Sequence, residues 1–266
     1  MFSLGMTFTN MRLAQQEPVR FIGLENWTRL FSDQRFITTL GNTLIFAITS
    51  VTVQYALGLL LAVLLNQKIR ARWFFRMSFL LPLMMSPVAV SFMIGKLMLS
   101  ESRGPFAALL MSLDLPPMRW STAPFGSMAV LIAVDTWQWT PFFILVLLAG
   151  LQSVDAEIQE AAKVDGANAW QTFWRITFPM LLPLSTIAIL IRSLEAFKVV
   201  DIIRVVTGGG PGNSTESVTL YAYTMGMNNG DLAYATTMAY VLLIATILYA
   251  TAFLFISRRL TRWRDA

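Results

Sequence analysis

The chain has 266 residues and contains neither cysteine nor histidine. Without cysteine it has no disulfide framework and no thiolate metal site. Without histidine it lacks the most common general base, the most common zinc ligand and the usual pH switch. An intramembrane enzyme would need a pair of aspartates or a serine–lysine dyad instead. Asp135 and Asp201 fall near opposite ends of their predicted helices, which argues against such a pair.

Charged residues are also scarce, at 13% of the chain against 56% hydrophobic residues, with a mean hydropathy of +0.60. A soluble domain has about 25% charged residues. This deficit indicates that lipid surrounds much of the chain. The net charge is +5, and short basic runs lie beside apolar segments. This pattern is typical of a signal for membrane orientation and is a poor match for a nucleic-acid surface.

Five apolar stretches are each long enough to cross a bilayer, which takes about 20 helical residues. None alternates as a strand would, so we expect an all-α membrane protein, a polytopic helical bundle. The predicted spans cover residues 37–65, 74–99, 126–151, 178–200 and 233–256. Pro82, Pro87 and Pro141 lie inside spans and predict kinks that pack against neighbouring helices.

Two basic clusters predict the orientation of these spans. They comprise Lys68, Arg70, Arg72 and Arg76 after the first span, and Arg258, Arg259, Arg262 and Arg264 after the last. Positive charge favours the cytoplasmic side, so both clusters, the loop 152–177 and the tail 257–266 are expected there. Residues 100–125 and 201–232 are then outside.

Residues 1–36 are expected on the outer face, although they carry several arginines and no signal peptide precedes them. The opening "MFSLGMTFTN" reads as the tail of a membrane helix whose body is missing or truncated. The alternative is that the chain begins here and its N-terminus is translocated as a tail.

The loop between the third and fourth spans is unusually charged and rich in alanine. Ser153 or Asp155 can cap a helix there, acidic residues fill its first turns, and Gly166 is a natural terminator. A second short helix over 168–176 should follow, and Pro179 should open the fourth span. The alanines give the first helix a smooth face for another protein, whereas the alternative is a solvated amphipathic connection.

The stretch "EAAKVDGANAWQTFWRITFP", residues 160–179, resembles the EAA motif of permease subunits of binding-protein-dependent ABC transporters. The matching positions are Glu160, Ala161, Ala162, Gly166, Ile176 and Pro179. Phe178 stands where the family usually has leucine. The stretches 23–33 and 207–216 are similar to the sugar-permease branch, of the maltose and glycerol-3-phosphate type, so the resemblance covers nearly the whole chain.

This resemblance implies the fold of type I ABC importer permeases in the inner membrane. Members normally have six or more spans, which also implies a missing first helix. Residues 155–166 would be a coupling helix that docks on the ATPase through Glu160, Ala161, Ala162, Asp165 and Gly166. The implied partners are a second permease subunit, a dimer of ATP-binding subunits that holds ATP and magnesium, and a periplasmic or lipid-anchored solute-binding protein. This chain would be non-catalytic, with no cofactor or metal of its own.

Polar groups inside the spans predict either a packing ladder of ion pairs or a wet pathway for a hydroxyl-rich solute. Arg192 and Glu195 are three residues apart and can pair, as can Glu195 and Lys198. In maltose-type relatives the sugar contacts fall in these same two helices. The candidate pathway residues are Asp135, Gln138, Trp139, Phe142, Arg192, Glu195, Ala196, Lys198 and Val199.

Two further questions stay open at this point. An ATP-independent secondary transporter or channel would also contain embedded charges, but it predicts no docking helix and often an inverted repeat, which we do not see. The glycine-rich segment 208–214 lacks the Gly-Lys-Ser/Thr of a phosphate loop and is expected to be an outer turn or a contact for the binding protein. The solute is not identified, because Arg192 can face a phosphate, a sulfonate or only Glu195.

Overall fold

The computed structural model describes residues 2–14, 18–67, 72–116 and 119–262, although the side chains of a few residues in these ranges, such as Arg72, are not described. The regular secondary structure in these ranges is helical, and their extended pairing is limited to a single bridge between Thr9 and Phe21. Lys68, Arg70 and Arg264 of the predicted basic clusters lie outside the described residues.

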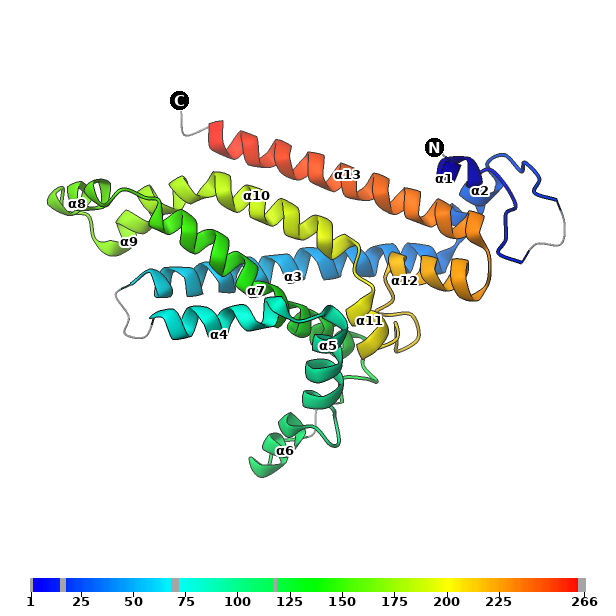
Figure 1. The fold of residues 1–266 in the computed structure, drawn as a ribbon, viewed down its shortest axis with the longest axis horizontal. Helices are drawn as coiled ribbons and strands as arrows, with labels where there is room; N and C mark the ends of the chain where they lie inside the picture. The colour runs from blue at the N-terminus through cyan, green and yellow to red at the C-terminus, as the bar shows by residue number, and fades with distance from the viewer. Residues whose placement is uncertain (1, 15–17, 68–71, 117–118, 263–266) are drawn as a thin grey trace.

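Four long apolar helices lie side by side and form the body of the molecule (Figure 1). They are α3 (Gln34–Asn66), α7 (Pro124–Gln152), α10 (Phe178–Phe197) and α13 (Leu232–Arg262). Each agrees with a predicted span, with ends that differ by a few residues. Pro141 lies inside α7 without ending it. The expectation of a polytopic helical bundle is therefore confirmed.

The centre of the bundle is the packing of α3 against α7. A β-carbon added to Gly58 of α3 would collide with the β-carbon of Phe143 in α7. Glycine thus allows the two backbones to approach closely, as small residues do between helices in lipid. Around this contact, Val51, Ala62, Leu147 and other buried apolar side chains form a continuous core.

The second predicted span, residues 74–99, is not one continuous helix, and it breaks just before Pro87, one of the positions where a kink was predicted. The chain forms α4 (Arg72–Met84), breaks, and resumes as α5 (Pro87–Val90) and the π-helical η1 (Ser91–Met98), with a bend of 105°. Pro87 explains the position of the break, because a proline forces the residue before it out of the helical conformation. That residue, Ser86, is extended. The segment after the break projects away from the bundle together with α6 (Pro105–Ser112) (Figure 1).

The fourth span begins nine residues earlier than predicted, at Ala169 instead of Phe178. α9 (Ala169–Thr172) runs through the π-helical η2 (Phe173–Thr177) into α10, so residues Ala169–Phe197 form one 29-residue helix. Pro179 therefore does not open the span. It lies near the start of α10, where its missing N–H is tolerated.

The two ends of the bundle carry different elements (Figure 1). One end holds α8 (Ala156–Val164), α9 and the C-terminal ends of α3 and α13. The N-terminal segment and α12 lie at the other end. The remaining elements are α1 (Phe2–Met6), α2 (Glu25–Ser32), α11 (Asp201–Val206), α12 (Val218–Tyr223) and η3 (Thr224–Asn228). The predicted cytoplasmic loop 152–177 thus shares an end with the C-terminal end of α13.

Candidate functional site

A buried polar network joins α3, α7 and α10 in the middle of the bundle. Nη2 of Arg192 donates to Oδ2 of Asp135, and the exposed fractions of these side chains are 2% and 3%. Nε of Arg192 also donates to Oε1 of Gln54 at 2.9 Å, and Nε2 of Gln54 donates to Oδ2 of Asp135 at 2.7 Å. The three side chains therefore satisfy one another in a closed ring of hydrogen bonds.

This network corrects the predicted partner of Arg192, which is Asp135 and not Glu195. A charge buried without a partner is very costly, so the pair and its glutamine hold each other in place. The guanidinium of Arg192 also lies over the ring of Trp139, 4.7 Å from its centroid. Sequence reasoning missed Gln54, although an isolated amide inside an apolar span was a visible signal.

A small cavity of about 120 Å³ lies beside this network. Its walls come from α7, α10, the start of α5 and the start of α11. The lining residues are Pro87, Asp135, Trp139, Arg192, Glu195, Ala196, Lys198, Val199, Val200, Asp201 and Ile202. The structure thus gathers all the predicted pathway residues around one cavity except Gln138 and Phe142. We call this cavity the polar pocket.

Gln138 and Phe142 have other surroundings. Nε2 of Gln138 donates to the backbone carbonyl of Met85 at 3.1 Å, at the break between α4 and α5. It therefore satisfies a backbone group that the break removes from the helix. The ring of Phe142 packs edge to face against Phe143, with centroids 5.4 Å apart, and borders the apolar core. Their geometry gives both residues structural surroundings outside the polar pocket.

The exposed rim of the polar pocket carries a second ion pair. Nζ of Lys198 donates to Oε1 of Glu195 at 2.7 Å, as their spacing predicts. Their side chains are 62% and 48% exposed, so unlike Arg192 they can reach a solute. The carboxylate of Asp201 lines the same pocket and is exposed. The rim therefore offers both donors and acceptors for hydroxyl groups.

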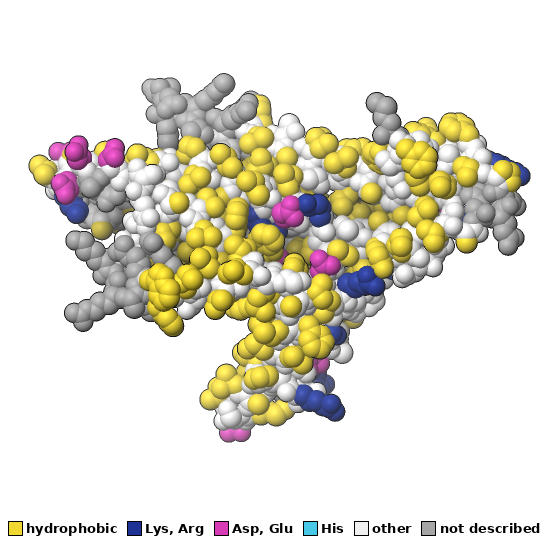
Figure 2. All heavy atoms as spheres, in the orientation of Figure 1, with side chains coloured by type: hydrophobic (Ala, Val, Ile, Leu, Met, Phe, Trp, Pro, Cys, Tyr) yellow, Lys and Arg dark blue, Asp and Glu magenta, His cyan; other side chains and the backbone are white. Residues whose placement is uncertain are grey.

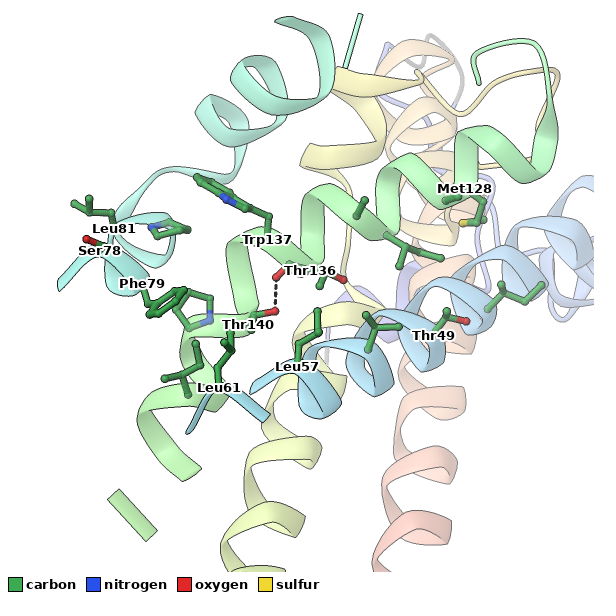
Figure 3. Close-up of a pocket in the computed structure, with 18 of the residues that line it drawn as sticks. Thr49, Leu57, Leu61, Ser78, Phe79, Leu81, Met128, Thr136, Trp137 and Thr140 are labelled. Atoms are coloured by element: carbon green, nitrogen blue, oxygen red, sulfur yellow. Dashed lines mark hydrogen bonds between the residues drawn. The ribbon is translucent and has the colours of Figure 1, made fainter. Parts of the chain in front are cut away.

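A second and larger cavity is a mainly apolar groove of about 980 Å³ between α3, α4 and α7 (Figure 3). Leu57 and Leu61 of α3 and Phe79 of α4 line it. The hydroxyl of Thr140 donates a hydrogen bond of 2.7 Å to the backbone carbonyl of Thr136, so its hydrogen is not available to a solute. The groove offers some hydroxyl groups, such as those of Thr49 and Ser78, but none of the described residues that line it is charged. The smaller polar pocket, with charged groups at its rim, is therefore the better candidate for a polar solute.

The loop 152–177 begins with a helix and a turn, as predicted, but the predicted second short helix is the first part of the continuous helix Ala169–Phe197. Asp155 occupies the N-cap position of α8, but its side chain makes no capping hydrogen bond. Gly166 ends the turn after α8 with a φ of +81°, and nothing lies within 4 Å of an added β-carbon. Glycine is thus required there for its backbone conformation and not for space. Asn168 and Gln171 form a capping box that starts α9.

The surface of α8 and the following turn exposes both acidic and apolar side chains. Acidic side chains gather at the end of the molecule that α8 forms (Figure 2). Glu160, Ala161 and Asp165 are exposed, whereas Ala162 is buried. The apolar side chains of Val164 and Trp170 are 87% and 71% exposed beside them. Apolar side chains displayed in this way mark surfaces for another protein.

At the end of the bundle opposite α8, the side chain of Asp33 connects the start of α3 to α12 and α13 through hydrogen bonds. Both Tyr221 and Tyr234 donate to Oδ2 of Asp33 at 2.7 Å. Burial opposes the ionisation of Asp33, but hydrogen bonds from Tyr234, Tyr221, Phe36 and Arg35 outweigh it and lower the pKa of Asp33 below its ordinary value. We call this set the Asp33 network.

Two salt bridges extend the Asp33 network to the glycine-rich loop and to α13. Arg35 binds both carboxylate oxygens of Glu216 at 2.8 Å, and Arg29 binds Asp231 at 2.9 Å. The start of α3, the loop 207–217 and the start of α13 are thus fastened together. Within the described ranges, no group of three or more acidic side chains is placed to hold a metal ion.

Sequence comparison relates the chain to transport proteins. Residues 54–265 match the family model described as binding-protein-dependent transport system inner membrane component. The chain is 34% identical over 238 residues to the trehalose/maltose transport system permease protein MalF of Thermococcus litoralis, covering 90% of this chain and 80% of that protein. It is 31% identical over 252 residues to the sulfoquinovosyl glycerol transport system permease protein SmoG of Agrobacterium fabrum, covering 95% and 82%.

Structural comparison agrees with this result. The fold is similar to a chain of a bacterial alginate ABC transporter solved in complex with an alginate pentasaccharide-bound periplasmic protein. The TM-score is 0.82 at 25% identity, and the match covers 90% of this chain and 84% of that one. The matched family region includes the C-terminal part of α3, from residue 54 onward, and all of the later long helices. The chain therefore belongs to the family of inner membrane components of binding-protein-dependent transport systems, as a multi-pass ABC transporter permease.

Proposed function

We propose that this chain forms one half of the translocation pathway for a sugar, polyol or related carbohydrate that a soluble binding protein delivers. The observation that carries this proposal is the polar pocket, where Trp139 and the exposed Glu195–Lys198 pair face one cavity. Charged groups form strong hydrogen bonds with hydroxyls. The relatives named for sugars support the same class of solute. The second permease subunit supplies the other half.

The coupling to ATP is assigned to α8. This helix and the turn after it protrude at one end of the bundle and expose acidic and apolar side chains together. We assign Glu160, Ala161, Asp165 and Gly166 to the contact with a dimer of ATPase subunits, which binds ATP and magnesium and performs the hydrolysis. Ala162 of the predicted set is buried within this chain, so its side chain is not part of the contact. Family membership gives no support to the alternative of an ATP-independent transporter.

The mechanism is alternating access. ATP binding closes the ATPase dimer, moves the docked helices and opens the pathway outward to the loaded binding protein, and hydrolysis resets it. Because coupling between two sites is reciprocal, the delivered solute must also promote closure of the ATPase dimer. Solute-stimulated ATP hydrolysis is therefore the expected signature.

The test is charge reversal on α8. Glu160→Lys replaces an exposed carboxylate on the proposed docking face, and a lost charge-assisted contact of this kind costs roughly 2–5 kcal/mol. That loss weakens association by a factor of about 30 or more. Co-purification of the ATPase and solute-stimulated hydrolysis in liposomes should both fall.

The matched control is Glu25→Lys, the same reversal on exposed α2 at the opposite end, where association with the ATPase should not change. Normal association and normal stimulation in Glu160→Lys would contradict the assignment of α8. Residues 155–166 would then be only a solvated connection.

A further inference from the structure

We propose that the polar pocket is a charge filter that admits uncharged polyhydroxylated solutes and excludes anions. This inference rests on the proposed function, because it concerns the same pathway. The family leaves the question open, since relatives of this chain are named both for trehalose and maltose, which are neutral, and for sulfoquinovosyl glycerol, which carries a sulfonate. We therefore infer the charge of the accepted solute from the charged side chains that line the pocket.

The first argument is that the guanidinium of Arg192 is not available to a solute. Its Nη2 and Nε atoms donate to Asp135 and Gln54, its face lies over Trp139, and the side chain is 2% exposed. To bind a phosphate or sulfonate through Nη2, Arg192 would have to leave Asp135 buried and unpaired, which is costly in a low-dielectric interior, and an exposure of 2% leaves little of the remaining guanidinium for a solute. Arg192 is therefore a positioning residue that holds α7 against α10.

The second argument is the balance of the charges that line the pocket. Asp135, Glu195 and Asp201 contribute −3, and Arg192 and Lys198 contribute +2, so the sum is −1. The one cation with an exposed ammonium, Lys198, is held by Glu195 at 2.7 Å. An entering anion therefore meets net repulsion, whereas hydroxyl groups can donate to the carboxylates and accept from the ammonium.

The chain has no cysteine of its own, so a single introduced cysteine can report the local potential. Val199→Cys places a thiol in the pocket wall, and Val200→Cys is a second reporter in the same wall. The complete transporter, with its second permease and ATPase subunits, is treated with a cationic, an anionic or an uncharged methanethiosulfonate reagent. Modification of this chain is followed by mass, and each rate is divided by the rate with a free thiol.

We expect the cationic reagent to react at least about threefold faster than the anionic one after this normalisation. Glu195→Gln in the reporter background should reduce that ratio, and Lys198→Gln, a matched loss of the opposite charge, should increase it. An anionic reagent that reacts as fast as the cationic one, or charge variants that leave the ratio unchanged at both reporters, would overturn the charge filter. If even the uncharged reagent fails at both reporters in every state, the pocket is not a wet pathway, and the proposed function fails together with the filter.

Discussion

Tyr234 donates a 2.7 Å hydrogen bond to Asp33 across 201 residues of sequence, and so joins the start of α13 to the start of α3. The same carboxylate accepts from Tyr221 and from the first backbone amides of α3. One ionised side chain therefore caps a long helix and also fastens two distant elements to it.

The Asp33 network predicts a dependence of stability on pH. The pKa of Asp33 in the folded protein lies below the ordinary value of 3.8, so its ionisation contributes stability that is complete above that value. This contribution is lost as the pH falls below about 4 and through the lower, folded pKa. Thermal unfolding in detergent between pH 3 and pH 7 should show the loss. Asp33→Asn, which keeps a capping side chain, should show a smaller change over the same pH range, and an equal change would contradict the prediction.

The buried pair of Asp135 and Arg192 predicts a non-additive pair of substitutions. Arg192→Met leaves the carboxylate buried without its partner and should destabilise the protein by about 3–5 kcal/mol. Asp135→Leu combined with Arg192→Met removes both charges and should be markedly more stable than Arg192→Met alone. Thermal unfolding of the purified proteins measures the difference. A double variant less stable than Arg192→Met would show that the pair does not behave as a unit.

The close contact of α3 and α7 predicts opposite effects for one substitution at two positions of a single helix. In Gly58→Ala the new methyl group meets Phe143, and overpacking of this kind costs about 1–3 kcal/mol. In Gly41→Ala nothing lies within 4 Å of the new group, and alanine is the better helix former, so stability should hold or rise. The two unfolding temperatures, measured side by side, test this. Equal unfolding temperatures would argue against close packing at Gly58.

The predicted orientation can be tested by labelling. Single cysteines at Gln67 and Gln171 should be protected from an impermeant thiol reagent in intact cells, whereas a cysteine at Ser112 should react. All three positions are exposed, so burial does not explain protection. Broken cells provide the control, because all three positions should react there. Labelling of Gln67 and Gln171 but not Ser112 in intact cells would invert the topology.

Hydropathy was sufficient to predict the long helices, because each apolar run had one arrangement that satisfied its backbone in lipid. It could not predict the shape of the second span. Pro82 and Pro87 indicated a kink, but the size of the bend, 105°, is associated with contacts from elsewhere in the chain. Gln138 donating to Met85 is one of them, and it joins residues 53 positions apart.

In the candidate site, too, the contacts between residues close in sequence were predictable, and those between residues far apart in sequence were not. The Glu195–Lys198 pair was predictable because the two residues are three apart at the C-terminal end of α10, where Lys198 is the C-cap residue. The partner of Arg192 was not, since Asp135 is 57 residues away and competes successfully with the nearer Glu195. Spacing within a helix reveals neighbours on that helix alone, whereas the choice between neighbours depends on how three helices pack.

The unbroken helix from Ala169 to Phe197 makes the end near α8 and the polar pocket parts of one rod. At about 1.5 Å per residue, the distance along the axis from Ala169 to Arg192 is roughly 34 Å. A tilt of about 5° about the Ala169 end would therefore shift Arg192 by about 3 Å, roughly the length of one hydrogen bond. Because the helix is continuous, a small rotation at α9 would become a displacement large enough to change the contacts of the pocket.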